Sequence, residues 1–229
     1  RAVRPSDGVS TMTARMHPLV EFALAGILFA GCDQSEKAGQ ALSMHESAFD
    51  SPSDLEEYLA SVVEYRRVKD KFFKENGESP LKGEDRVAFR RLKYYEASEE
   101  FIFRVTLQKF ENPQSLKIGT TTGDVRNAIK YGYFDFAVGG KPQRLHIYKF
   151  IPEPESYLFL PFTDATNGKE TYGAGRYLDF EESQDETYLL DFNLAYSPSC
   201  AYDENYSCPI PPKENRLDVA IEAGEKNFH

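Results

Sequence analysis

The stretch that decides the fold runs from Phe134 to Phe150 and has the sequence FDFAVGGKPQRLHIYKF. Its two ends, Phe134–Val138 and Arg144–Phe150, are short runs in which apolar and polar residues alternate, and Gly139-Gly140 stands between them. Alternation with a period of two predicts a strand with one buried face, and a glycine pair predicts a tight turn. This stretch therefore predicts an antiparallel β-hairpin.

About nine runs of this kind follow one another without an intervening helical pattern. The other seven are Phe101–Gln108, Leu116–Thr121, Val125–Tyr131, Tyr157–Phe162, Arg176–Phe180, Thr187–Leu194 and Leu217–Ile221. Such spacing predicts a mainly β (α+β) fold, either an antiparallel β-sandwich or a partly closed barrel. Tyr157–Phe162 is apolar on both faces, which predicts a central strand that is covered on each side.

A helix is predicted to open the folded part of the chain and to pack against the strands. Ser53-Asp54-Leu55-Glu56 matches a capping box, and apolar residues recur at helical spacing from Leu55 to Phe72. Asn76-Gly77 and then Pro80 predict where the helix ends.

The N-terminus predicts an export signal. Phe22–Ala30 is an apolar run too short to span a bilayer, and it ends in Ala30-Gly31-Cys32. This arrangement resembles the lipobox of bacterial lipoprotein signal peptides, in which the cysteine thiol accepts a lipid; the alternative is an apolar helix with an incidental cysteine. We expect translation to begin at Met12 or Met16.

Three segments follow from that interpretation. Residues 1–32 are an N-terminal extension and lipoprotein-type signal peptide, residues 33–52 are a polar tether, and residues 53–229 are a single β-rich domain. We expect an exported protein of the bacterial cell envelope that is bound to the membrane through a lipid anchor at Cys32.

Charge and composition narrow the range of partners. The 229 residues include 37 acidic and 27 basic side chains, which gives a net charge of -10 and predicts no binding to nucleic acid. Hydrophobic residues make up 41% of the chain, enough to form a buried core.

The densest polar cluster lies in a glycine-rich loop before the Arg176 run. It contains Asp164, Thr166, Glu170, Thr171, Tyr172 and Arg176, between Gly168, Gly173 and Gly175. Glycines let a backbone approach a ligand closely, and an arginine side chain can clamp a carboxylate or phosphate. The alternative is a tight turn in which Arg176 pairs internally with Asp164, Glu170 or Asp179.

A proline-rich segment, SCPIPPKENR from Ser207, predicts an extended strap that ends at Arg216. We expect Arg216 to approach the glycine-rich loop. The predicted ligand-binding residues are therefore Asp164, Glu170, Tyr172, Arg176 and Arg216.

Cys200 and Cys208 are the two cysteines outside the signal region. Their spacing permits a disulfide-closed loop or two ligands of a metal, and in an exported protein the disulfide is the ordinary expectation. We expect no cofactor, and metal binding at this pair remains the alternative because it needs two more ligands.

Three classes of function remain open. No Gly-x-Ser-x-Gly elbow is present and histidines are few, which disfavours a Ser-His-Asp hydrolase. The leading hypothesis is a domain that binds a small molecule or an envelope component. The alternatives are a carboxylate- or metal-dependent enzyme using Asp164, Glu170 and Arg176, and a structural envelope protein.

Three long motifs carry a family resemblance. They are FFKENGESPL from Phe72, PFTDATNGKETYGAGRYLDF from Pro161, and DFNLAYSPSCAYDENYSCPIPPKENRLDVAIEAGEK from Asp191. Together they resemble the bacterial and archaeal family called domain of unknown function 1684, over about Val62 to Lys226. The resemblance implies no activity, cofactor or substrate.

Overall fold

The computed structural model describes residues 47–152 and 157–229. The predicted signal peptide, its lipidation site Cys32 and residues 33–46 of the predicted tether lie outside the described residues. Within the described part, the model contains no helix with the length and apolar character needed to cross a membrane.

The long helix α1 spans Pro52–Glu75 and is followed by the short helix α2, Gly83–Ala88. Its N-cap is Ser51, whose side chain accepts a hydrogen bond from the backbone N–H of Asp54 at 3.2 Å. The predicted capping box at Ser53 is thus wrong by two residues, because Ser51 lies within reach of that N–H group. The helix ends before Asn76, as the sequence predicted.

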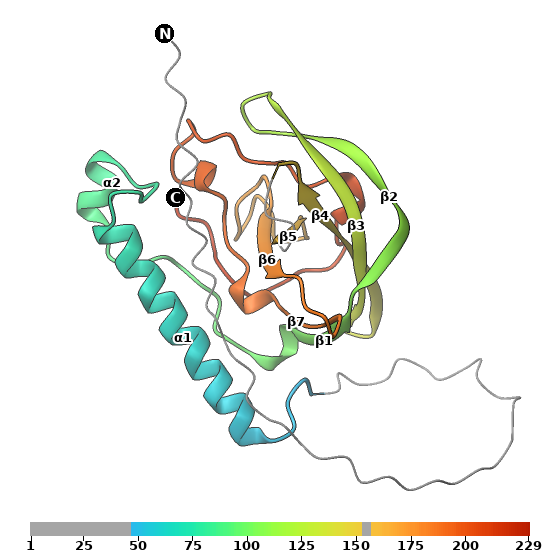
Figure 1. Cartoon of the computed structure of the whole chain (residues 1–229). Coiled ribbons are helices and arrows are strands. Elements are labelled where there is room, and N and C mark those ends of the chain that lie inside the picture. The colour runs from blue at the N-terminus through green and yellow to red at the C-terminus, as the bar shows by residue number, and fades with distance from the viewer. Residues whose placement is uncertain (1–46, 153–156) are drawn as a thin grey trace, which may run out of the picture. The chain divides into compact units, whose positions relative to one another are not determined.

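Seven strands occur in the described residues, arranged in two antiparallel sheets (Figure 1). The two-stranded sheet pairs β1 with β7, and the five-stranded sheet has the order β2-β3-β4-β5-β6. The strands are β1 Ile102–Thr106, β2 Gln108–Gly119, β3 Val125–Val138, β4 Lys141–Phe150, β5 Tyr157–Phe162, β6 Arg176–Glu181 and β7 Thr187–Asp191. Short 3-10 turns occupy Glu99–Phe101, Phe192–Leu194, Ser199–Ala201 and Lys213–Asn215. The mainly β prediction with an N-terminal helix is confirmed, and the sheets do not close into a barrel.

Most strand predictions are confirmed, with differences in several bounds. β2 begins at Gln108 instead of Leu116, and β7 ends at Asp191 instead of continuing to Leu194. The hairpin between β3 and β4 turns at Gly139-Gly140, as predicted. Val125–Tyr131 and Phe134–Val138, predicted as separate strands, form the single strand β3, which shifts its register near Gly132 instead of ending.

The predicted strand Leu217–Ile221 is absent from the sheets. Its backbone forms hydrogen bonds with the glycine-rich loop and with Arg176 instead. The N–H of Ala165 donates to the carbonyl of Val219, and the carbonyl of Ile221 accepts from the Arg176 side chain. A carbonyl that is bonded to a buried guanidinium does not continue a strand ladder.

The core occupies both faces of the five-stranded sheet. Leu158, Leu160 and Phe162 of β5 pack into the larger cluster, with Phe103 and Phe192 among their neighbours, and the alternate residue Phe159 packs into a second cluster on the other face. The prediction that this strand is central and covered on each side is confirmed.

The contacts between α1 and the β-rich part include several polar ones. Lys69 forms a 2.7 Å ion pair with the buried Glu225, and the Arg66 guanidinium donates to the carbonyls of Tyr95 and Asn193. The Tyr58 hydroxyl donates to Asp191 at 3.1 Å. These bonds fix the helix along one side of the sheets (Figure 1).

Candidate functional site

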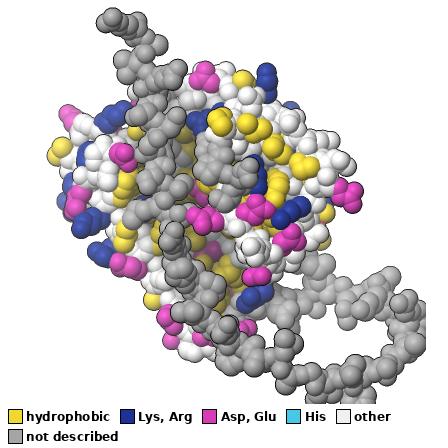
Figure 2. Space-filling view, in the orientation of Figure 1, with side chains coloured by type: hydrophobic (Ala, Val, Ile, Leu, Met, Phe, Trp, Pro, Cys, Tyr) yellow, Lys and Arg dark blue, Asp and Glu magenta, His cyan; other side chains and the backbone are white. Residues whose placement is uncertain are grey.

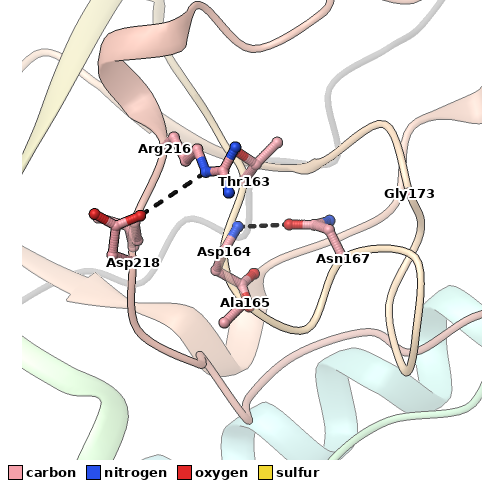
Figure 3. Close-up of a pocket in the computed structure, with 8 residues that line it drawn as sticks. Thr163, Asp164, Ala165, Asn167, Gly173, Arg216 and Asp218 are labelled. Carbon is pink, nitrogen blue, oxygen red and sulfur yellow. Dashed lines mark hydrogen bonds and ion pairs between the residues drawn. The ribbon is translucent and has the colours of Figure 1, made fainter.

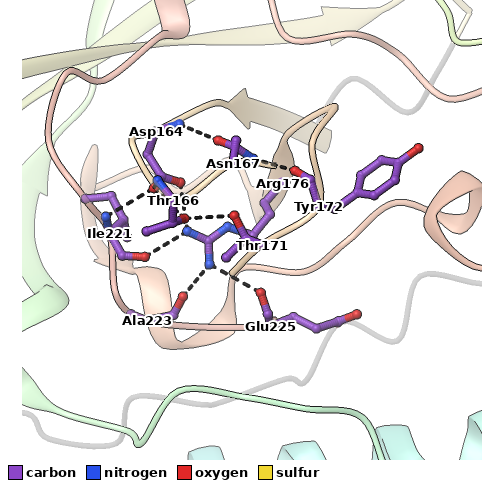
Figure 4. Close-up of polar contacts among 9 residues, drawn as sticks. All are labelled: Asp164, Thr166, Asn167, Thr171, Tyr172, Arg176, Ile221, Ala223 and Glu225. Carbon is purple, nitrogen blue, oxygen red and sulfur yellow. Dashed lines mark hydrogen bonds and ion pairs between the residues drawn. The ribbon is translucent and has the colours of Figure 1, made fainter. Parts of the chain in front are cut away.

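Arg176, the first residue of β6, lies fully inside the protein with 0% of its surface exposed. Its Nη2 donates to Asp164 Oδ2 at 2.9 Å and to the carbonyl of Ile221 at 2.9 Å, and its Nη1 donates to the carbonyl of Ala223 (Figure 4). These acceptors all belong to the chain itself. Arg176 therefore joins the glycine-rich loop to the C-terminal segment.

The Asp164 carboxylate also accepts several hydrogen bonds from within the protein. Its Oδ1 accepts from the backbone N–H of Thr166 at 2.8 Å, from the Thr166 hydroxyl at 2.6 Å and from the N–H of Ile221 at 3.2 Å. Thr166 in turn bonds to the buried Thr171 hydroxyl at 2.8 Å. The Arg176–Asp164 pair is therefore a scaffold element, since both side chains have 0% of their surface exposed and are bonded to groups of the protein interior.

The structure does not bring the five predicted ligand-binding residues together, because some of them are buried and others lie at the surface. Arg176 and the Asp164 carboxylate are interior, and Glu170 is exposed. The Tyr172 ring points away from the Arg176 guanidinium (Figure 4). Arg216 stands at the surface with 75% of its side chain exposed.

Arg216 and the backbone of the glycine-rich loop line one cavity of about 370 Å³, here called the Arg216 cavity (Figure 3). Its walls include Thr163, Asn167, Gly173, Leu217 and Asp218. The structure therefore brings Arg216 to this loop, as the proline-rich strap suggested, but it separates Arg216 from the sequestered Arg176.

Hydrogen bonds inside the glycine-rich loop fix the wall of the Arg216 cavity. The Asn167 side chain accepts from the Asp164 N–H at 2.5 Å and donates to the carbonyl of Tyr172 at 2.5 Å, so it closes the loop on itself. Both amide groups of Asn167 are occupied by these bonds. The cavity wall is consequently fixed before any ligand arrives.

The strap, residues 207–216, sets the position of Arg216. Asn215 accepts from the N–H of His146 at 2.8 Å and donates to the carbonyls of His146 at 2.8 Å and Pro161 at 2.7 Å. Pro211 packs so closely on Gly175 that a Cβ there would lie 2.6 Å from its Cγ, and Gly175 has a positive φ of 104°. Glycine is required at that position.

The electrostatics of the Arg216 cavity depend on one loose pair. Arg216 Nε lies 3.9 Å from Asp218 Oδ1, and 93% of the Asp218 side chain is exposed. The mouth of the cavity thus presents a cation and an anion side by side (Figure 3).

Cys200 and Cys208 are buried free thiols, so the structure does not contain the disulfide that we expected between them. The Cys200 N–H donates to Cys208 Sγ at 3.2 Å, and the Tyr172 hydroxyl lies 3.6 Å from Cys200 Sγ. The Cys208 thiol, hydrogen-bonded to the Cys200 sulfur, lowers the pKa of Cys200 to about 6, and Tyr172 and Thr121 act in the same direction against the effect of burial. The same contact raises the pKa of Cys208.

A second cavity, of about 600 Å³, is lined by Cys200 and is here called the Cys200 cavity. Its walls include Tyr172, Cys200, Tyr202 and the ion-paired Lys82 and Asp203. Among residues 47–152 and 157–229, no three His, Cys, Asp or Glu side chains gather as a metal site would require.

Sequence reasoning missed Thr163, Asn167 and Asp218 as cavity residues. Asp218 follows Arg216 by two positions in an extended segment, and such residues point to the same side, so this pairing was within reach of the sequence. No sequence pattern marks Thr163 and Asn167 as cavity residues, because whether they line the cavity depends on how the loop folds.

The visible surface carries charges of both signs. On the face shown in Figure 2, Lys and Arg side chains are interspersed with Asp and Glu side chains. Many are paired across elements, as in the cluster of Lys109, Lys149 and Glu182, where the two amines lie 3.0 Å and 2.6 Å from the carboxylate.

Comparisons with known proteins place the chain in a family. The solution NMR structure of an uncharacterized protein from Haloarcula marismortui is similar to this one, with 34% sequence identity and a TM-score of 0.61, over 77% of this chain and 97% of that chain. No curated protein matches. The family model described as Protein of unknown function (DUF1684) matches residues 87–226. Since that match covers more than half of its length, the chain belongs to the DUF1684 family.

Proposed function

We propose that this protein is an exported, lipid-anchored binding domain that holds the anionic group of a small polar ligand in the Arg216 cavity. The observation that carries the proposal is the position of Arg216, a largely exposed guanidinium at a cavity whose polar wall is already rigid. The lipobox-like sequence ending at Cys32 supports the envelope location.

Arg216 is suited to exchange partners. Exposed ion pairs contribute little to stability, and the Arg216–Asp218 pair is both exposed and long at 3.9 Å. A guanidinium makes two parallel hydrogen bonds to a carboxylate or phosphate, so a ligand can offer a better partner than Asp218 does.

Asp218 narrows the chemistry of the ligand. An anionic group bound at Arg216 would lie beside the Asp218 carboxylate, which repels a purely anionic molecule unless that molecule also carries a donor. A ligand with an anionic group next to an ammonium or N–H group satisfies both side chains. An amino acid or the end of a peptide chain has this arrangement.

The rigid wall of the Arg216 cavity favours binding, because the loop that forms it does not have to become ordered when the ligand binds. Asn167, Asp164 and Arg176 hold the loop through bonds that exist without ligand. Preorganisation reduces the entropic cost of association.

The test uses ligand-induced stabilisation of the full chain carrying Cys32→Ser, which prevents lipidation. Glycine, acetate and inorganic phosphate serve as probes at constant ionic strength. At about ten times its Kd, a bound probe stabilises the protein by about 1.4 kcal/mol and raises Tm by roughly 3 to 6 °C. Arg216→Met should abolish the shift, whereas Arg90→Met, which removes the same charge from an exposed position, should keep it.

Two outcomes contradict the proposal: the absence of a shift with all three probes, or an equal shift in Arg216→Met and in the unsubstituted chain. They would favour the second candidate, a structural envelope protein. That candidate has its own support, because both terminal nitrogens of Arg176, Nη1 and Nη2, donate hydrogen bonds inside the protein.

A further inference from the structure

The two free thiols have a geometry that the proposed ligand site leaves unused. Cys200 lies in the 3-10 turn Ser199–Ala201 and Cys208 lies at the start of the strap, and the two side chains are in contact. Cys200 is among the residues that line the Cys200 cavity. Cys208 is held behind it, where its backbone N–H and carbonyl both bond to Thr121.

We propose that Cys200 and Cys208 form a redox-active dithiol that reduces small aliphatic disulfides. Cys200 attacks from the cavity, and Cys208 resolves the mixed disulfide. The pair is independent of the ligand proposed for Arg216, so either proposal can fail without the other.

Two observations support the division of roles between the cysteines. Cys200 borders a cavity large enough for a small disulfide, with a volume of about 600 Å³. The Tyr172 hydroxyl lies 3.6 Å from its sulfur and can donate to a thiolate. A thiolate that is stabilised by donors and borders an open cavity is the usual attacking partner in thiol exchange.

The loop between the cysteines favours closure of the pair. Cys208 is anchored to the end of β2 through Thr121, and the Tyr177 hydroxyl bonds to the carbonyl of the next residue, Pro209. The resolving sulfur is thus held beside Cys200 instead of having to search for it. Such placement makes the intramolecular step fast compared with a second encounter.

The reaction balances in two steps. The Cys200 thiolate attacks one sulfur of RSSR, the Cys200–SR bond forms, the RS–SR bond breaks, and RS⁻ leaves. Cys208 then loses its proton and its sulfur attacks the Cys200 sulfur, which forms the Cys200–Cys208 bond and releases the second RS⁻. Both RS⁻ take up protons, so the dithiol loses two electrons and the small disulfide becomes two thiols.

The titratable groups around Cys200 come from every element that packs there. Tyr172 comes from the glycine-rich loop, and Tyr177 and Arg126 act on Cys208 from the sheet. The cavity wall adds Lys82, Asp85, Asp203, Glu204 and His229. Lys82 is paired with Asp203. The side chains that hydrogen-bond to the Cys200 sulfur are Cys208, Tyr172 and the non-titrating Thr121.

The experiment uses the full chain with Cys32→Ser, reduced, freed of reductant and treated with oxidised glutathione. Intact-mass and peptide analysis should find a closed Cys200–Cys208 bond that dithiothreitol reopens under native conditions. Cys208→Ser should accumulate one glutathione on Cys200. Cys200→Ser should react at Cys208 at least about tenfold more slowly.

A second measurement covers the case in which the serine variants do not fold. Iodoacetamide alkylation of the intact dithiol, mapped by peptide mass, should modify Cys200 first, with an apparent pKa well below that of a free cysteine. Tyr172→Phe should slow this alkylation about tenfold at a pH below the Cys200 pKa of about 6, because it removes one hydrogen bond to the thiolate. Tyr202→Phe, which removes a buried hydroxyl from another tyrosine that lines the Cys200 cavity, should not slow it.

The proposal is overturned if the two cysteines are alkylated at equal rates or react only after denaturation. It is also overturned if a native disulfide resists dithiothreitol until the protein unfolds. Each of these results would make the pair a purely structural feature.

Discussion

Arg176 Nη2 lies 2.9 Å from Asp164 Oδ2, and neither side chain has any exposed surface. Breaking a buried pair leaves one charge uncompensated, at a cost of about 3 to 5 kcal/mol. Arg176→Met should therefore lower the free energy of unfolding by that amount in urea denaturation. The control, Arg216→Met, removes an exposed guanidinium and should change it by less than about 0.5 kcal/mol. Equal effects of the two substitutions would refute the scaffold role of Arg176.

The strap should depend on Asn215 in the same way. Asn215→Ala leaves the N–H of His146 and the carbonyls of His146 and Pro161 without their partner. We expect a loss of about 3 kcal/mol in the free energy of unfolding, since each buried unsatisfied group costs about 1 kcal/mol or more. Asn205→Ala, at an exposed position, is the control and should be nearly neutral. A neutral Asn215→Ala would show that the strap is held by other contacts.

The Lys69–Glu225 ion pair attaches α1 to the β-rich part, and substitutions at these residues test that role. Lys69 Nζ lies 2.7 Å from Glu225 Oε2, and 15% and 1% of the two side chains are exposed. Lys69→Met should cost about 3 to 5 kcal/mol, and adding Glu225→Gln should recover part of it, because the unpaired charge disappears. Lys71→Met is the control, since Lys71 pairs with Glu75 at 3.9 Å on the exposed face. Additive effects of the two substitutions would contradict a direct coupling.

The lowered pKa of Glu182 predicts that the stability of the fold depends on pH. Burial alone would raise its pKa, but hydrogen bonds from Lys149, Tyr131 and Lys109 lower it to about 2. Because the folded-state pKa is lower than the unfolded one, the stabilisation is complete above the unfolded pKa of about 4.3 and disappears as the pH falls toward 2. Glu182→Gln should flatten the pH dependence of the unfolding free energy in this window, and the exposed neighbour Glu181→Gln should not. Parallel profiles for the two variants would rule out this role.

Much of the fold was predictable because its determinants are local. The Gly139-Gly140 hairpin and the two-sided burial of Tyr157–Phe162 follow from residues that are adjacent in sequence. Leu217–Ile221 was predicted wrongly because the carbonyl of Ile221 bonds to Arg176, which lies more than forty positions away in sequence. The pattern of apolar residues does not reveal such a partner.

The candidate site was harder to predict because it also depends on partners that are distant in sequence. The sequence identified Arg176 and Arg216 as arginines near a glycine-rich loop. Only the tertiary structure shows that the Arg176 guanidinium is buried among carbonyls and that the Arg216 guanidinium lies at the mouth of a cavity. Asp164 was likewise recognisable as polar and central, whereas its saturation by Thr166, Ile221 and Arg176 depends on the folded chain.

The central claim, a ligand site at Arg216, is tested most directly by amide NMR. The ¹⁵N-labelled full chain carrying Cys32→Ser is titrated with glycine at constant ionic strength. We predict saturable shifts confined to the amides of residues 163–173 and 216–218, lost in Arg216→Met and retained in Arg90→Met. Shifts that do not saturate, that lie elsewhere, or that survive Arg216→Met would contradict the claim.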